Sequence, residues 1–392
     1  MPPEFPAAAV AAVFGAKMAR TFCYGFLGIL LPVYLSDLGM GATGVGVAVT
    51  CTLVGSAALT WAVRRPAEVF GGRAALVALA GLSAVAALLL LATREPWLVV
   101  LATMLGNVAV GTGETGPFLA IEQVVIARAV RAERRTLALS VYNLLGYVAA
   151  GLGAAVVAAF GVRTLFAVFL AGAGVQALAY LWLPEARAGA GVAARGPLTS
   201  APLIRRLAAL FALDSFAGGF TLQSLVALYL HTRFEFDLAS LGSVFLGVQL
   251  LTGLSMLLAV PAARRFGLLP TMVWSHVASN ILLIAIGLAT TPVAAVAFLL
   301  ARHLLSQMDV PTRQAYVMAV VEDHEREAAA ALTNVARTVA QALSPAATGW
   351  IMQTIALGAP FALGGGLKIV YDLLLWRTFR DVTPRTEERR AT

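Results

Sequence analysis

Charged side chains stand inside apolar stretches of this sequence that are long enough to cross a bilayer. A charge at the bilayer centre costs on the order of 3 kcal/mol on insertion scales, so each one needs a partner or a function. Carboxylates in that setting can carry a proton, and basic groups can neutralise them or bind an anionic solute. The residues concerned are Lys17, Arg20, Glu114, Glu122, Asp214, Arg302, Asp309, Arg313, Arg337, Lys368 and Asp372.

Spacing along a helix separates acids that could carry a proton from acids that are held in a fixed ion pair. Glu114 and Glu122 are eight residues apart, which places both on one helix face. Glu114 has the better claim to carry a proton, because a desolvated carboxylate can hold one at physiological pH. Asp309 and Arg313 have the i, i+4 spacing of an ion pair on one helix. Such a pair favours an ionised Asp309 that holds the structure in place over one that carries a proton. We assign substrate binding or proton coupling to Arg20, Tyr24, Glu114, Asp309 and Arg313.

The other charges suit gating or contacts between helices. Members of this group are Lys17, Glu68, Arg73, Glu122, Asp214, Arg302 and Arg337. Lys368 and Asp372 are four residues apart and are expected to neutralise each other. An alternative of equal weight makes Arg20, Glu114 and Asp309 a structural ion-pair network that holds the two halves together.

Motifs of enzymes and of metal sites are missing from the sequence. The four histidines, His231, His276, His303 and His324, lack the spacing of metal ligands. No Ser/His/Asp arrangement survives placement on helices, and no glycine run resembles a nucleotide loop. We therefore expect no catalytic residues, no metal and no cofactor, and an energy source other than bound ATP.

Composition indicates that most of the chain is surrounded by lipid. Of the 392 residues, 60% are hydrophobic and 12% are charged, and the mean hydropathy is +0.85. A soluble domain lacks enough polar residues to coat that much apolar surface, whereas a bilayer requires helices of roughly 20 apolar residues. We predict an all-α polytopic membrane protein with twelve transmembrane helices. They lie near residues 9–35, 43–63, 74–92, 97–127, 136–160, 163–183, 206–231, 239–262, 270–290, 294–321, 328–356 and 359–379.

The longest polar break divides the twelve helices into two sets of six. It spans residues 184–205, is rich in Ala, Gly, Pro and Arg, and is expected to be a cytoplasmic linker. The predicted parts are thus an N-terminal six-helix bundle over 1–183, a C-terminal six-helix bundle over 206–380 and a cytoplasmic tail over 381–392.

Arginines favour one side of the membrane. Loops after odd-numbered helices hold Arg94, Arg163 and Arg233, whereas loops after even-numbered helices, the linker and the tail hold most of the others. The positive-inside rule then places both termini in the cytoplasm. The net charge of +8 lies where loops meet anionic headgroups, so the expected partner is the lipid bilayer and not nucleic acid. Only two lysines occur, which suggests a GC-rich bacterial genome and the bacterial inner (plasma) membrane.

The two halves repeat each other. VYL at 33–35 aligns with LYL at 228–230, an offset of 195 residues. The same offset pairs Asn107 with Arg302 and Glu114 with Asp309. Two copies of a six-helix unit are typical of transporters, whose substrate site lies at the interface between the copies.

With these features the chain resembles the major facilitator superfamily over nearly its whole length. The family's first cytoplasmic loop reads G-x-L-A-D-R-x-G-R-R, and residues 64–73 keep Gly71 and Arg73 while Glu68 replaces the Asp. The Arg of the family's helix 4 signature is Asn107 here, and the corresponding Arg survives in the second half as Arg302. The Gly-Pro antiporter signature of helix 5 is absent. Residues 214–220 and 307–314 are similar to a bacterial, drug-efflux-like subgroup of unassigned substrate.

The resemblance implies a fold and a mode of action. It implies that helices 1, 4, 7 and 10 line a central cavity, and all four carry charge here. Our leading hypothesis is a monomeric secondary active transporter, which alternates access by rocking its two halves and exports a small amphiphilic or drug-like solute as a proton antiporter. One alternative is an importer or facilitator of an organic anion, motivated by Lys17, Arg20 and Arg313. Another is a lipid-handling or receptor-like membrane protein that transports nothing.

Overall fold

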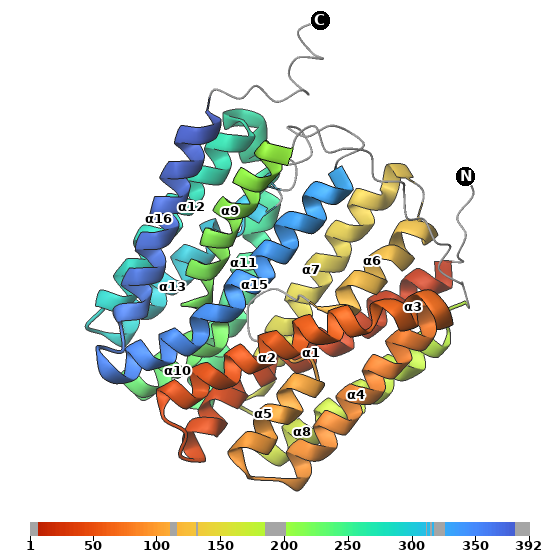
Figure 1. Ribbon diagram of the computed structural model, residues 1–392. Coiled ribbons are helices and arrows are strands. Elements are labelled where there is room, and N and C mark those ends of the chain that lie inside the picture. Colours follow the sequence, from red (N-terminus) through yellow and green to blue (C-terminus); the bar gives the residue numbers. More distant parts are fainter. Residues whose placement is uncertain are drawn as a thin grey trace, which may run out of the picture. The chain divides into compact units, whose positions relative to one another are not determined.

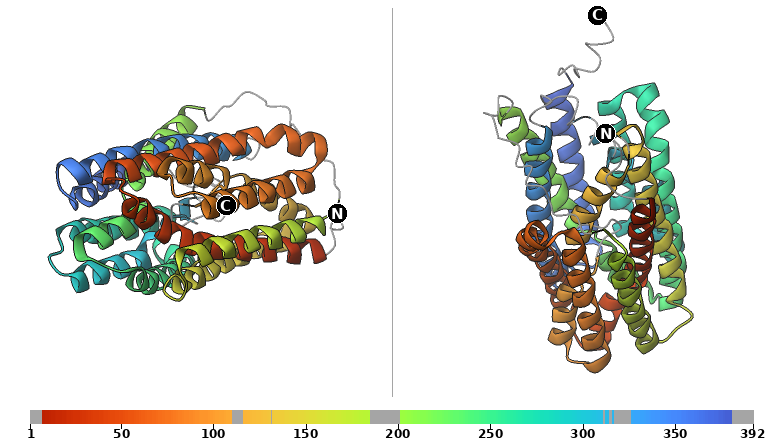
Figure 2. Two further views of the ribbon diagram at one scale, coloured as in Figure 1. Left: turned by 90° about the horizontal axis from the view of Figure 1, so that it is seen from below. Right: turned by 90° about the vertical axis from the view of Figure 1, so that its right-hand side faces the viewer.

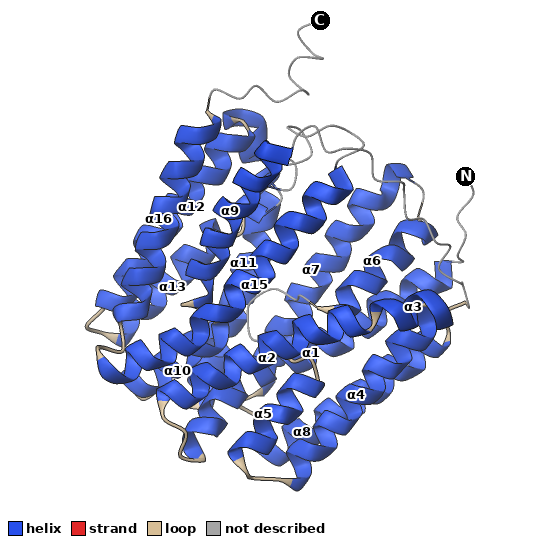
Figure 3. Ribbon diagram, in the orientation of Figure 1, coloured by secondary structure: helices blue, strands red, loops and turns tan. Residues whose placement is uncertain are grey.

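The structure is built from α-helices joined by loops. In the part of the chain that the structure describes, every regular element is a helix (Figure 3), which confirms the all-α class. The computed structural model describes residues 7–109, 116–130, 132–184, 201–310, 312–313, 316 and 326–380.

The first of two compact units takes residues 1–192 and 226–249. Within it α1 packs along α7, and α4 runs beside α8 (Figure 1 and Figure 2). The unit also includes α10 (Gln223–Phe234) from Val226 onward and the beginning of α11 (Leu238–Phe266). Its other helices are α1 (Ala7–Asp37), α2 (Ala42–Ala62), α3 (Arg64–Phe70), α4 (Gly72–Ala92), α5 (Pro96–Leu105), α6 (Pro117–Ala129), α7 (Ala132–Val156) and α8 (Val162–Leu181).

The second unit takes residues 193–225 and 250–392. Within it α9 packs along α15, and α12 packs against both α13 and α16. Its helices besides the end of α11 are α9 (Ala201–Gly219), α12 (Leu268–Leu288), α13 (Pro292–Ser306), α15 (Arg326–Thr354) and α16 (Ala359–Phe379).

Most of the predicted transmembrane segments appear as long apolar helices. Among the described residues, nine helical stretches are long and apolar enough to cross a membrane. Three shorter apolar helices are α5, α13 and the first ten residues of α6. α15 has 29 residues but a more polar composition, and it coincides with the eleventh predicted span. A chain with these helices is suited to cross a bilayer many times.

Three predicted helices are interrupted. The helix expected over 97–127 ends at Leu105 and resumes at Pro117, because Asn107 takes a left-handed φ of 49° that ends a helix and Pro117 suits a first turn. The helix expected over 206–231 breaks at a turn over 220–222, directly after Gly219. The helix expected over 294–321 has a break after Ser306.

The internal repeat is visible in the backbone. Gly39 and Glu235 both have positive φ angles, 92° and 56°. Gly71 and Gly267 do too, at 88° and 89°, and each directly precedes a helix of 21 residues. Both pairs are 196 residues apart, and this shared spacing indicates matched turns in the two halves.

The structure corrects the offset of the repeat by one residue. α4 begins at Gly72 and α12 at Leu268, which are 196 residues apart, where the sequence alignment used 195. α5 and α13 begin at Pro96 and Pro292, which are also 196 residues apart.

Glycines allow a close helix crossing in the first unit. A Cβ atom on Gly25 of α1 would lie 2.0 Å from the carbonyl oxygen of Ala150 in α7. A Cβ atom on Gly153 would lie 1.9 Å from the carbonyl oxygen of Phe22. Neither position has room for a side chain, so these two glycines fix how closely α1 and α7 approach.

Candidate functional site

Arg20 of α1 and Glu122 of α6 form a buried two-point ion pair. Arg20 Nη1 donates to Glu122 Oε1 at 3.1 Å and Nη2 donates to Oε2 at 2.7 Å, and both side chains are 0% exposed. Tyr180 and Tyr142 each donate a hydrogen bond to the same carboxylate, Tyr180 at 2.6 Å. The Phe118 ring centroid lies 4.4 Å from the guanidinium carbon of Arg20. We call these five residues the N-terminal cluster.

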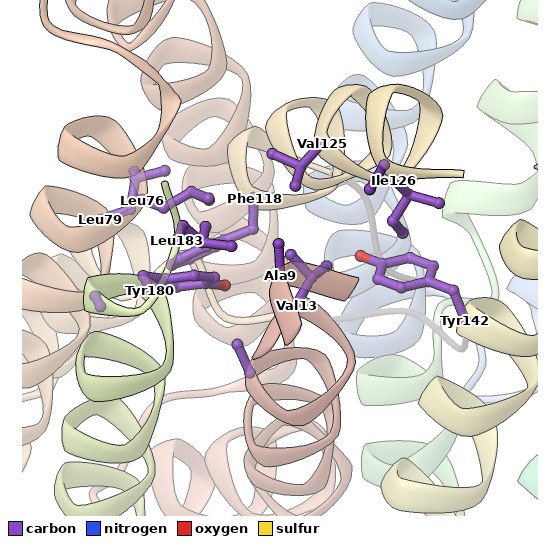
Figure 4. Packing of buried hydrophobic residues seen from close by; sticks show 13 residues of the cluster. Ala9, Val13, Leu76, Leu79, Phe118, Val125, Ile126, Tyr142, Tyr180 and Leu183 are labelled. Atoms are coloured by element: carbon purple, nitrogen blue, oxygen red, sulfur yellow. The ribbon is translucent and has the colours of Figure 1, made fainter. Parts of the chain in front are cut away.

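The N-terminal cluster joins four helices of its unit. Glu122 accepts four hydrogen bonds, which offset the cost of removing its charge from water. The hydroxyl groups of Tyr142 on α7 and Tyr180 on α8 point toward one another from two sides of α1, within an apolar shell (Figure 4). Arg20 thus pairs with Glu122 inside its own unit, a partner different from the Glu114 and Asp309 that the sequence suggested.

Two further predicted residues of α1 lie in the same unit. Lys17 Nζ lies 4.6 Å from the ring centroid of Tyr142. A Cβ atom on Gly146 would lie 2.7 Å from Lys17 Cε, so this glycine leaves room for the lysine. The Tyr24 hydroxyl donates to the carbonyl oxygen of Gly106 at 3.3 Å, which connects α1 with the end of α5.

Asp214 of α9 is the centre of a second group of buried charges, in the second unit. Its Oδ1 accepts a hydrogen bond from Lys368 Nζ of α16 at 2.6 Å. Its Oδ2 lies 3.5 Å from Arg313 Nη1, which also donates to Asp309 Oδ2 at 2.6 Å. The i, i+4 pair expected between Asp309 and Arg313 is therefore present, and it extends to Asp214 on another helix.

His276 of α12 stands between two carboxylates. Its Nδ1 lies 2.8 Å from Asp372 Oδ1, and its Nε2 lies 3.8 Å from Asp214 Oδ1. Asn280, one turn further along α12, donates to Asp372 Oδ2 at 3.2 Å. We name the C-terminal cluster by its six buried members, Asp214, His276, Asp309, Arg313, Lys368 and Asp372.

Two more arginines surround the C-terminal cluster. Arg302 of α13 and Arg337 of α15 both attract Asp214 and Asp309 electrostatically. Arg337 Nε also donates to Ser215 Oγ at 3.0 Å. Added to the two basic and three acidic members of the cluster, they give four basic groups against three acids while His276 is neutral. A buried region with surplus positive charge favours an anion.

Three predicted residues remain, and two of them, Glu68 and Arg73, have described positions. Glu114 lies outside the described residues. Glu68 is exposed on α3. Arg73 Nη1 donates to the carbonyl oxygen of Leu183 at 3.4 Å. The first-loop residues therefore contribute to neither cluster in the part of the chain that the structure describes.

Sequence reasoning missed His276 and mispaired two neighbours. Lys368 and Asp372 were expected to neutralise each other, but Lys368 bonds to Asp214 and Asp372 bonds to His276. A pair on one helix competes with partners on facing helices, and here the partners on α9 and α12 are the ones bonded. One signal was present in the sequence: His276 and Asn280 are two polar residues one turn apart within an apolar span.

Comparisons with known proteins agree with this architecture. The sequence profile of the Major Facilitator Superfamily matches residues 13–301 and 207–392. An uncharacterized membrane protein of Saccharomyces cerevisiae, YJR124C, is 21% identical over 96% of this chain and 95% of its own.

Solved transporters share the fold at low identity. A mutant of the nucleoside transporter NupG has a TM-score of 0.77 at 13% identity, over 95% of this chain and all of its own. The D-xylose-proton symporter has a TM-score of 0.72 at 14% identity, covering 94% of this chain and 96% of that one. The human organic anion transporter MFSD10 has 0.68 at 15% identity, covering 94% and 100%.

The profile match, the repeated helices and the solved structures agree. The chain is a multi-pass helical membrane protein whose family consists of transporters of small solutes and not of enzymes. It belongs to the Major Facilitator Superfamily.

Proposed function

We propose that this chain is a proton-coupled secondary transporter of a small organic solute that works by alternating access. The carrying observation is the C-terminal cluster, in which three acids, two cations and a histidine are buried together. Buried charges of this kind are typical of proton and solute pathways. A proton gained by one member changes the pairing of the others, and this gives protonation a means to act on solute binding.

Export of a small amphiphilic or drug-like solute in exchange for protons is the first candidate. It requires an acid or a histidine that releases its proton when the solute binds. The C-terminal cluster supplies such groups in Asp214, His276 and Asp372.

Import or facilitated movement of an organic anion is the second candidate. It is favoured by the surplus of basic groups around Asp214, where Arg302 and Arg337 add to the cluster. The structural likeness to a human organic anion transporter is in keeping with this candidate.

Reconstitution separates these candidates. We would place the purified full-length chain in liposomes that contain the pH dye pyranine, and add ethidium, benzenesulfonate, uridine or xylose. An exporter coupled to protons should move protons against ethidium, and an anion importer should move protons together with benzenesulfonate. A chain that moves neither protons nor any of these solutes would instead favour the lipid-handling or receptor-like class.

Glu114 is the rival proton carrier that the sequence favours. If it carries the proton, Glu114→Gln should abolish proton-driven transport and leave solute exchange intact. If this variant still shows full proton-driven transport in the same liposomes, Glu114 is not the proton carrier and the C-terminal cluster remains the candidate.

We also propose a bacterial inner membrane location, a monomeric state and cytoplasmic termini. The arginine bias of the loops supports the orientation.

A further inference from the structure

Lys368 and His276 approach the same oxygen atom. Asp214 Oδ1 accepts from Lys368 Nζ at 2.6 Å and lies 3.8 Å from His276 Nε2. The first distance is a charge-assisted hydrogen bond, and the second is longer than a hydrogen bond. Lys368 therefore holds this oxygen while His276 remains beside it.

The other nitrogen of His276 fixes which tautomer the neutral ring adopts. Nδ1 lies 2.8 Å from Asp372 Oδ1 and 3.3 Å from Asn280 Nδ2, and we take the shorter contact as the hydrogen bond. With Asp372 ionised its carboxylate can only accept, so we assign the ring proton to Nδ1. Asn280 Nδ2 donates to the second oxygen of Asp372 at 3.2 Å and holds that carboxylate in place. In the neutral ring Nε2 consequently presents a lone pair to Asp214.

A lone pair facing a carboxylate oxygen is repelled, whereas a protonated Nε2 is attracted. A proton on Nε2 would turn the 3.8 Å approach into an ion pair and add a second cation to Asp214 Oδ1. Only the protonated ring can donate from both nitrogens at once, so the pairing with Asp214 depends on this proton. The incoming imidazolium competes with Lys368.

We propose that His276 binds the coupled proton, and that its protonation releases Lys368 from Asp214 to bind the anionic group of the solute. This proposal rests on the proposed proton-coupled transport and names its solute class: a carboxylate, sulfonate or phosphate. Gly218 lies beside the lysine, since a Cβ atom there would be in ordinary van der Waals contact with Lys368 Nζ at 3.5 Å.

The surroundings of His276 support a charge competition of this kind. α9 contributes Asp214, α12 contributes Asn280 and α16 contributes Asp372, Lys368 and the Tyr371 ring, whose centroid lies 6.0 Å from that of His276. Beyond Asp214 lie Arg313, Arg302 and Arg337 with Asp309, so four basic groups face three acids in this region.

Proton uptake is the first test, and it needs no solute. We would titrate the purified full-length chain between about pH 8 and about pH 5 and compare it with His276→Asn, which keeps an N–H for Asp372. The wild type should take up about one proton more than the variant. Equal uptake would overturn the proposal.

His303 provides a matched control. It is also buried in the second unit, but its Nδ1 bonds to the carbonyl oxygen of Leu299 and its Nε2 lies 3.5 Å from Arg302 Nη1. The neighbouring arginine opposes a second proton, so His303→Asn should match the wild type. If His276→Asn does not fold, His276→Gln takes its place.

Anion binding is the second test. Benzenesulfonate stays ionised across this pH range, so any pH dependence belongs to the protein. Calorimetry should show binding about tenfold tighter at about pH 5.5 than at about pH 8. His276→Asn should remove that dependence, and Lys368→Gln should remove binding at both pH values. Equal affinity at both pH values, or no binding at either, would overturn the role of Lys368.

The proposed function and this inference fail in different ways. If solute and proton fluxes are not coupled in wild-type liposomes, the proposed function fails. If they are coupled and His276→Asn keeps the coupling, only the assignment to His276 fails.

Discussion

At the scale of single residues, Glu122 shows how a membrane protein keeps a charge at its core. Its carboxylate takes hydrogen bonds from Arg20, Tyr142 and Tyr180, so both oxygens are used. Asp214 differs, since three cationic or titratable side chains approach its two oxygens at distances from 2.6 to 3.8 Å. The first site is suited to hold helices together, and the second is suited to exchange partners.

Glu122→Gln tests whether the ion pair with Arg20 stabilises the first unit. The variant leaves the buried Arg20 guanidinium without a counter-charge, so we expect a loss of about 3–5 kcal/mol in the free energy of unfolding. Thermal unfolding in detergent measures it, with Glu68→Gln on the exposed α3 as the control that should change little. If Glu122→Gln is as stable as the wild type, the ion pair does not stabilise the fold.

Pairs within one helix were predictable, and pairs between helices were not. The spacing of Asp309 and Arg313 was enough to predict their bond, since i and i+4 side chains meet on any helix. The same spacing gave a wrong prediction for Lys368 and Asp372. They bond to residues of other helices, Lys368 to α9 and Asp372 to α12. Helix rotation and depth decide such pairs, and one sequence fixes neither.

At the scale of helices, the close crossing of α1 and α7 positions Arg20 and Tyr142 of the N-terminal cluster. Gly25→Ala should destabilise the first unit by about 1–3 kcal/mol, because its Cβ atom would overlap the backbone of Ala150. Gly15→Ala is the matched control on α1, since a Cβ atom there meets nothing within 4 Å. Thermal unfolding of the two variants should differ clearly, and equal melting temperatures would count against the α1–α7 crossing.

The start of α11 depends on an ionised cap. Asp237 Oδ1 accepts from the Ser240 backbone N–H at 2.8 Å, and hydrogen bonds from the Ser240 hydroxyl and amide lower the pKa of Asp237. A lowered pKa adds stability above the ordinary aspartate pKa of about 3.9, and that stability is lost as the pH falls through the lowered value.

Asp237→Asn tests this cap. The wild type should melt at a higher temperature than the variant near neutral pH, and the two should converge in acid. A difference that persists unchanged in acid would show that the carboxylate charge plays no part.

Apolar length was enough to predict the helices, but not their interruptions. Runs of about 20 apolar residues place the spans because the bilayer sets that length. The break before Pro117 depends on the left-handed Asn107, and the break after Gly219 depends on local turns. Glycines and polar residues stand at both places in the sequence, but apolar length alone does not show whether a helix ends there.

At the scale of the whole molecule, the orientation in the membrane can be tested directly. With Cys23 and Cys51 replaced, single cysteines at Asp37, Arg94 and Glu235 should react with an impermeant thiol reagent from outside intact cells. Cysteines at Arg65 and Arg265 should react only after the membrane is opened. Labelling of Arg265→Cys in intact cells would reverse the proposed orientation.

The central claim is that proton movement drives solute movement through this chain. The most direct measurement is solute accumulation in liposomes under an imposed pH gradient, with and without an uncoupler. We predict accumulation of benzenesulfonate or ethidium above equilibrium, lost with the uncoupler and lost in His276→Asn. Fluxes of these solutes that only reach equilibrium, and that ignore both the gradient and the uncoupler, would contradict proton coupling.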